Sequence, residues 1–183
     1  KLLYFLSMIC ILFISQITFA QPATFYDYIW SPDGSRFIVM VQNDTTVIAT
    51  LYDDQWQPLA SRQVPSIGLQ FSPDGDSILV SGPPSEIWDA NTLQTVRVLP
   101  ISAQLWSPDG TELTNFDYNP PGGMKIYSAA DGHLLREFTA STAAAWGWPY
   151  GSSWSPNGDY FVTGVSNQLV LLDTITGQQV GAN

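Results

Sequence analysis

The sequence predicts an all-β protein built from about four similar units, and three observations support this prediction. A short phrase, an aromatic residue followed by Ser-Pro-Asp-Gly or Ser-Pro-Asn-Gly, occurs four times. Each copy is followed by an apolar or β-branched run, which is typical of a β-strand. After residue 21, no stretch combines a sustained helical period with helix caps. The hydrophobic content of 45% is ample for a packed core.

The spacing of the four copies defines the repeat unit. Successive aromatic residues of the phrase are 41, 35 and 48 residues apart, and a four-stranded propeller blade has a period of about 40–45 residues. The sequence therefore predicts a β-propeller with about four four-stranded blades. The expected blades span approximately residues 24–62, 66–100, 102–139 and 150–183, the last of them incomplete.

The chemistry of the phrase predicts a hairpin turn between the first two strands of each blade. Ser can accept a backbone hydrogen bond at the first turn position, and Pro presets φ at the second. Asp or Asn suits the third position, and Gly supplies a positive φ at the fourth. The aromatic residue ends the first strand, where its ring can pack between blades. The residues concerned are Trp30, Asp33, Gly34, Phe71, Asp74, Gly75, Trp106, Asp109, Gly110, Trp154, Asn157 and Gly158.

Two further strands are expected to complete each blade. They fall at residues 46–52 and 56–60, 86–89 and 95–99, 124–127 and 134–138, and 168–173 and 178–180. Because the last segment lies close to the end of the sequence, the outer strand of the fourth blade is expected to be cut short.

These motifs resemble those of the WD-repeat and TolB-like propeller families, and the resemblance covers residues 24–180. The Trp-Ser-Pro-Asp-Gly turns are similar to the TolB-like repeat, whereas Ile87-Trp88-Asp89 and Leu171-Leu172-Asp173-Thr174 are similar to the WD repeat. Standard WD repeats carry a Gly-His pair and a histidine-containing network in each blade, and this chain departs from that pattern because His133 is its single histidine.

The resemblance also implies how many blades the whole propeller has. Four blades could close into a small ring, but these families usually close with six or more. We therefore expect the sequence, which begins without Met and ends inside a blade, to be a fragment of a larger propeller with six to eight blades. Such a fragment would expose two unpaired edges.

The N-terminus has the form of a secretory signal peptide. Lys1 precedes an apolar run from Leu2 to Ile14, and Ala20 stands before the polar start Gln21-Pro22. We expect residues 1–20 to be removed after Ala20 and the mature chain to be secreted or periplasmic. The alternative is an uncleaved membrane anchor over residues 2–20, which would be the chain's contact with a membrane. The single cysteine, Cys10, lies in this segment, so the mature chain would form no disulfide.

The charge pattern argues against nucleic acid as a partner. The chain has sixteen acidic and six basic residues, which gives a net charge of −10. A polyanion would be repelled.

No catalytic or cofactor-binding constellation is recognisable in the sequence. His133 lies in a predicted turn far from any glycine-flanked serine, and we interpret it as a solvated turn residue. The counts of His and Cys exclude a metal site built from them in the mature chain. The pairs Asp53-Asp54 and Asp74 with Asp76 are interpreted as solvated turn carboxylates, with calcium binding as the alternative. We therefore expect neither enzymatic activity nor a cofactor.

The uneven repeat spacing suggests where a partner would bind. Much of the excess length of the third interval lies between residues 138 and 152, where aromatic residues cluster, and this connection is expected to open on the same face as the loops between second and third strands. Aromatic residues are enriched at binding hot spots. The candidate residues are Trp146, Trp148, Tyr150, Pro83, Pro84, Pro120 and Pro121. In the alternative interpretation, Trp146 and Trp148 pack against the neighbouring blade.

Two functions are compatible with these features. The first is a non-catalytic scaffold that binds a protein, a peptide or a carbohydrate outside the cytoplasm. The alternative is the propeller domain of a secreted hydrolase or peptidase whose catalytic part lies elsewhere in the gene. Fold alone does not separate them, because function resides in sites carried by a fold.

Overall fold

The computed structural model describes residues 24–43, 46–65, 68–117, 123–139, 152–165 and 168–182. Within these ranges the chain forms sixteen β-strands and no helix. The prediction of an all-β chain is therefore confirmed for the described residues, and none of them belongs to a helix that could cross a bilayer.

The strands form four antiparallel sheets of four strands each, in chain order, as predicted. Sheet 1 contains β1 (Thr24–Trp30), β2 (Arg36–Asn43), β3 (Thr46–Asp53) and β4 (Pro58–Val64). Sheet 2 contains β5 (Leu69–Phe71), β6 (Ser77–Val80), β7 (Ser85–Asp89) and β8 (Thr95–Leu99). Sheet 3 contains β9 (Leu105–Trp106), β10 (Glu112–Asp117), β11 (Gly123–Ser128) and β12 (Leu134–Thr139). Sheet 4 contains β13 (Ser153–Trp154), β14 (Tyr160–Val165), β15 (Gln168–Asp173) and β16 (Gln179–Ala182). The fourth strand of sheet 4, β16, has four residues and is the shortest of the four outer strands.

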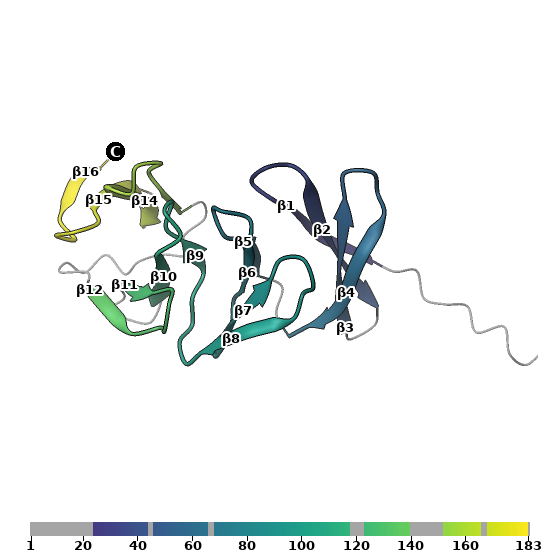
Figure 1. Ribbon diagram of the computed structural model, residues 1–183. Coiled ribbons are helices and arrows are strands. Elements are labelled where there is room, and N and C mark those ends of the chain that lie inside the picture. Colours follow the sequence, from purple (N-terminus) through teal and green to yellow (C-terminus); the bar gives the residue numbers. More distant parts are fainter. Residues whose placement is uncertain are drawn as a thin grey trace, which may run out of the picture.

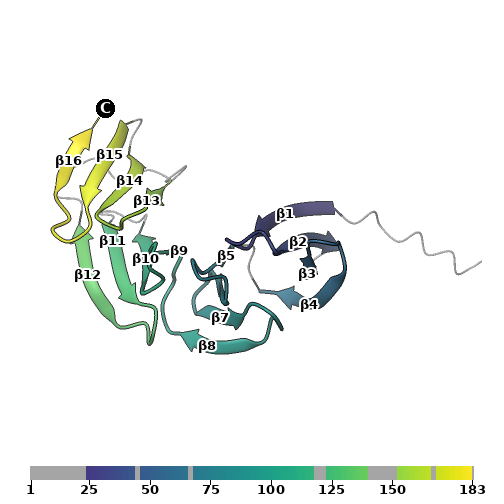
Figure 2. The ribbon, with the colours of Figure 1, turned by 45° about the horizontal axis from the view of Figure 1, so that its top comes forward.

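The four sheets stand one after another in a curved row (Figure 1). Figure 2 shows that the first strand of each sheet lies on the concave side of the row and the fourth strand on the convex side. Sheets 1 and 4 form the two ends of the row. A site on the concave side is therefore built from residues of several first strands.

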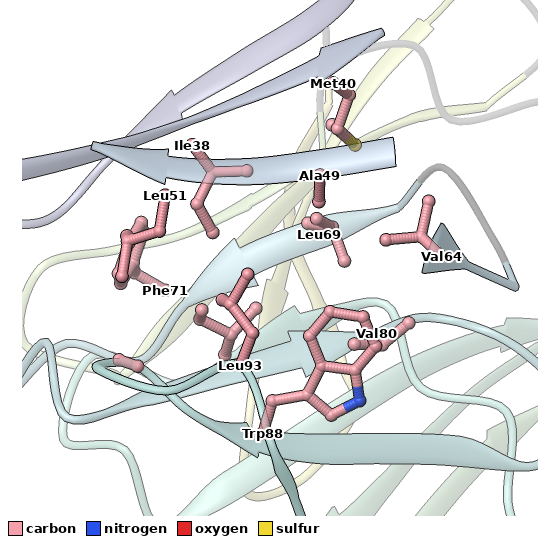
Figure 3. Packing of buried hydrophobic residues seen from close by; sticks show 12 residues of the cluster. Ile38, Met40, Ala49, Leu51, Val64, Leu69, Phe71, Val80, Trp88 and Leu93 are labelled. Atoms are coloured by element: carbon pink, nitrogen blue, oxygen red, sulfur yellow. The ribbon is translucent and has the colours of Figure 1, made fainter. Parts of the chain in front are cut away.

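Three hydrophobic clusters hold the row together, one between each pair of consecutive sheets. The first joins sheets 1 and 2, and its side chains come from both sheets, as Figure 3 shows for Leu51 and Trp88. The second joins sheets 2 and 3, and the third joins sheets 3 and 4. Burying a large apolar side chain contributes about 1.5–3 kcal/mol, so the packing between sheets is the main source of stability.

Because side chains alternate along a strand, each one faces either the preceding or the following sheet in the row. Successive residues of a strand point to opposite faces of its sheet. One cross-strand pair in each sheet points to the following position in the row: Ile38–Leu51, Leu79–Ile87, Thr114–Ile126 and Val162–Leu171. The adjacent pair points to the preceding position: Phe37–Tyr52, Ile78–Trp88, Leu113–Tyr127 and Phe161–Leu172. Equivalent positions of the repeat therefore recur in the contacts between consecutive sheets.

The repeated Ser-Pro-Asp/Asn-Gly phrase connects the first two strands of each sheet. Its residues hydrogen-bond to one another and to the start of the second strand. In sheet 3, the Ser107 hydroxyl donates to Asp109 Oδ1 at 2.6 Å and accepts the backbone N–H of Glu112 at 2.9 Å. The backbone N–H of Gly110 donates to the Ser107 carbonyl, and Gly110 has a φ of 72°. The other three copies form the same backbone bond. Each turn is therefore encoded by a few consecutive residues.

These turns predict a loss of stability in acid. Hydrogen bonds from the Ser31 and Ser35 hydroxyls lower the pKa of Asp33 to about 2, and bonds led by those of Ser72 and Ser107 lower the pKa of Asp74 and Asp109. An unfolded Asp has a pKa of about 3.9. The stabilisation is therefore present above that value and is lost as the pH falls toward the folded pKa.

We expect the melting temperature, measured by circular dichroism, to fall between roughly pH 5 and pH 2. In a Ser31→Ala variant this fall should be smaller, because the pKa of Asp33 moves toward its unfolded value. A melting temperature that stays constant down to pH 2 would contradict the prediction.

Candidate functional site

The predicted partner surface is described at only two of its residues. Pro83 and Pro84 lie in the connection between β6 and β7, joined by a cis peptide bond, and both side chains are exposed. The other five candidates, Trp146, Trp148, Tyr150, Pro120 and Pro121, lie outside the described residues.

The aromatic residues of the repeated phrase differ in exposure although their local sequence is nearly the same. Phe71, Trp106 and Trp154 each pack in the hydrophobic cluster toward the preceding sheet. Trp30 has no preceding sheet among the described residues, and it is 52% exposed. The aromatic ring of the phrase is therefore covered to different degrees in the four sheets, by contacts with the preceding sheet.

A cavity of about 340 Å³ lies where the first strands of sheets 2, 3 and 4 meet the turns that follow them. It is lined by Gln70, Phe71, Pro73, Leu105, Trp106, Ser107, Pro108, Ser152, Ser153 and Trp154. None of these side chains is charged, although the chain has a net charge of −10. Aromatic surfaces, hydroxyl groups and one carboxamide are the groups that such a cavity offers to a ligand.

Trp106 lines this cavity and carries an unused hydrogen-bond donor. Its side chain is 8% exposed, and its indole Nε1 is buried with no partner among the described residues. The backbone N–H of Trp106 is satisfied, since it donates to Gln70 Oε1 at 3.0 Å. A buried donor left unpaired costs about 1–3 kcal/mol. Because the Nε1 atom itself is buried, an acceptor atom on a ligand recovers this cost only where the side chains around the indole shift to admit it.

A second cavity, of about 290 Å³, lies between sheets 3 and 4 at their turns. It contains an ion pair between Arg136 and Glu112, and it is bordered by Asp109 and Asp159. The acidic groups already have partners: Asp109 accepts hydrogen bonds from Ser107 and Thr111, and Asp159 accepts one from Asn157. Arg136 Nε is also buried without a partner among the described residues. Because the charged groups of the second cavity are paired within the protein, the cavity on the first strands is the candidate for a neutral ligand.

Two of the acidic residues considered as calcium ligands, Asp53 and Asp74, accept hydrogen bonds within their own turns. Asp53 Oδ1 accepts the backbone N–H groups of Gln55 and Gln57. Asp74 Oδ1 accepts the Ser72 hydroxyl and the backbone N–H of Asp76. Across the described ranges, no group of three or more His, Cys, Asp and Glu side chains could hold a metal ion.

His133 pairs with a neighbour in its own turn. Its Nδ1 lies 2.6 Å from Asp131 Oδ1, and both side chains are exposed in the connection between β11 and β12. This contact contributes most to lowering the pKa of Asp131 to about 2. The pair therefore organises the turn.

No sequence pattern pointed to this cavity as a site. Three of its lining residues, Gln70, Leu105 and Ser153, occupy the position immediately before the repeated phrase, so an alignment of the four copies could have drawn attention to them. Their meeting, however, depends on the curvature of the row. No protein-family model and no curated protein sequence matches the chain.

Proposed function

We propose that the chain is part of a β-propeller that works as a non-catalytic binding scaffold, with a neutral partner held on the concave side. Four sheets in a curved row with their first strands inside support the propeller arrangement. The phrase-based resemblance to TolB-like and WD repeats supports it independently. On this proposal the sheets are blades, and the first strands face the axis.

The observation that carries the binding proposal is the uncharged cavity, one of whose lining residues, Trp106, has an unpaired indole N–H. A charged ligand would find no counter-ion among the ten lining residues. A carbohydrate or an uncharged peptide segment offers both an acceptor oxygen for Trp106 Nε1 and a surface that can pack on aromatic rings. These two classes belong to the partners expected from the sequence.

Titration of the purified chain with neutral oligosaccharides and with capped, uncharged peptides tests the proposal, with isothermal calorimetry as the readout. We expect one of the two classes to bind. Trp106→Phe should then weaken binding about tenfold, because it removes one buried hydrogen bond and keeps most of the ring.

Trp56→Phe provides the matched control, because Trp56 lies in the turn between β3 and β4 and does not line the cavity. It should leave the affinity unchanged. Failure of both ligand classes to bind, or binding that Trp106→Phe leaves intact, would contradict the proposal.

Export belongs to the same proposal, since the N-terminal segment carries the pattern of a signal peptide. Expression of the full sequence in a bacterium should give a product outside the cytoplasm that begins at Gln21. Sequencing of its N-terminus measures this. A membrane-bound product that still begins at Lys1 would favour the anchor instead.

A further inference from the structure

An arginine side chain bridges sheets 1 and 2 at the end where the repeated turns lie. Arg36, the first residue of β2, donates from Nη2 to the Gly75 carbonyl at 3.0 Å and from Nη1 to the Ala90 carbonyl at 3.0 Å. Asn91 Oδ1 accepts a further hydrogen bond from Nη1. A planar guanidinium of one sheet therefore holds the turns of the next.

A guanidinium also bridges sheets 2 and 3 near their turns. Arg97 of β8 donates to the Ala129 carbonyl at 2.9 Å. Ala129 and Ala90 occupy the same position in their sheets: each directly follows the third strand, and its backbone N–H donates to the carbonyl of the residue after the repeated phrase. The carbonyl of this position thus accepts a guanidinium at two of the three contacts between described sheets.

Thr174 holds the corresponding position in sheet 4, since it directly follows β15 and forms the same backbone bond. Among the described residues, no arginine donates to its carbonyl. Arg136, which matches Arg97 in strand register, pairs with Glu112 of its own sheet. Glu112 stands where sheet 1 has Arg36, five residues after the serine of the phrase, whose hydroxyl accepts its backbone N–H. The third contact therefore has a carboxylate where the first has a guanidinium.

The gap between sheets 3 and 4 is open at this place and forms the cavity of about 290 Å³ described above. The glycines of the phrase show the difference between contacts. A Cβ on Gly75 would lie 3.6 Å from Cδ of Pro32 in the preceding sheet, whereas a Cβ on Gly158 would meet no atom within 4 Å. Asp159 and Ile175 at the border of the cavity are exposed, so a ligand can enter from solvent.

The lining of this cavity suits a planar cation. Its charged side chains are three acids, Asp109, Glu112 and Asp159, and one base, Arg136. A carboxylate has about four lone-pair sites, so Glu112 can bind Arg136 and a second donor group together. Trp154 also lines the cavity, and a guanidinium stacks on aromatic rings as well as donating in several directions.

We propose that this cavity binds the guanidinium of an arginine side chain carried by a partner peptide. The guanidinium takes the place that Arg36 has between sheets 1 and 2. It donates to the Glu112 carboxylate and to the Thr174 carbonyl, and it lies against the indole of Trp154. The net charge of −10 attracts such a cationic partner at long range.

Isothermal calorimetry of the purified chain with the capped peptide Gly-Gly-Arg-Gly-Gly tests the proposal. Two matched peptides carry citrulline, a neutral isostere of arginine, or lysine, a compact charge without the planar fork. We expect the arginine peptide to bind and each of the others to bind at least about tenfold more weakly, because a charged, forked donor is lost. Added salt should weaken the binding of the arginine peptide.

Substitutions locate the site. Glu112→Gln should weaken binding of the arginine peptide about tenfold, because it removes the charged acceptor. Glu86→Gln is the matched control, since Glu86 also pairs with an arginine, is similarly exposed and does not line the cavity. It should leave the affinity unchanged. Circular dichroism and melting temperature establish that each variant is folded.

The double variant Glu112→Arg with Arg136→Glu separates a guanidinium site from general charge attraction. It keeps three acids and one base in the lining, but it places a guanidinium at the position that Arg36 occupies in sheet 1. This internal guanidinium should fill the site and abolish binding of the arginine peptide.

Four results would overturn the proposal. They are no binding of the arginine peptide, a citrulline or lysine peptide that binds as tightly, and binding that survives either Glu112→Gln or the double variant. Trp106→Phe changes only the cavity of the first strands, so it should leave this affinity unchanged. A loss in Trp106→Phe would place the arginine in that other cavity and also overturn the proposal, which therefore fails separately from the proposed function.

Discussion

Replacing Trp88 by Ala should lower the free energy of unfolding by about 3–5 kcal/mol, the cost typical of removing a large buried aromatic side chain. Trp88 is completely buried between sheets 1 and 2. Its indole N–H donates to Glu86 Oε2 at 2.8 Å, and the Arg62 guanidinium of sheet 1 lies 4.1 Å from the centre of its ring. The substitution therefore removes packing, a donor to a carboxylate and a cation–π contact between sheets.

The same residues show why Trp88 acts as a link between sheets. Arg62 also donates to the Leu93 carbonyl at 2.9 Å and to the Thr95 hydroxyl at 2.8 Å, both in sheet 2 or its turn. The Trp88 N–H, followed by the Thr95 hydroxyl, lowers the pKa of Glu86. Loss of the indole would weaken this pKa shift as well as the core.

Urea denaturation followed by circular dichroism measures the effect. Trp88→Phe is the conservative comparison, because it keeps an aromatic ring and loses the N–H donor, and it should cost about 1–2 kcal/mol. A Trp88→Ala variant within about 1 kcal/mol of the unmodified chain would show that the contact between sheets 1 and 2 does not hold Trp88 as described.

Gly177→Ala should be the most damaging single-methyl substitution in the turns of the described chain, with a cost of about 2–5 kcal/mol. Gly177 lies between β15 and β16 with a φ of 68°. A Cβ at this position would lie 2.0 Å from Cδ1 of Phe138, whose ring belongs to β12 of sheet 3. The substitution thus combines backbone strain with a collision across the contact between sheets 3 and 4.

Gly158→Ala isolates the backbone contribution. Gly158 has a φ of 79°, and a Cβ there would meet no atom within 4 Å. Its cost should therefore be only the left-handed backbone term of about 1–2 kcal/mol. In a Phe138→Ala background, Gly177→Ala should fall to a similar value, because the colliding ring is absent. Equal costs for Gly177→Ala and Gly158→Ala, measured by urea denaturation, would disprove the collision.

The sequence by itself determined the local units of this protein. Ser107, Asp109 and Gly110 form their turn through bonds that span no more than five residues, so the phrase Ser-Pro-Asp-Gly suffices to encode it. The alternation of apolar residues around each turn then assigns the strands. This is why four four-stranded sheets could be predicted, and the same phrase supplied the period that separates them.

Only the tertiary structure decided which side chains are buried and where a ligand could enter. Trp30 and Trp106 stand in the same five-residue phrase, yet the first is half-exposed and the second is buried, because Trp106 packs against sheet 2 and none of the described residues covers Trp30 in the same way. The cavity at Trp106 likewise joins Gln70 to Ser153 from sheets far apart in the chain. Such contacts arise from how whole sheets curve and pack, and no pattern within a single repeat encodes them.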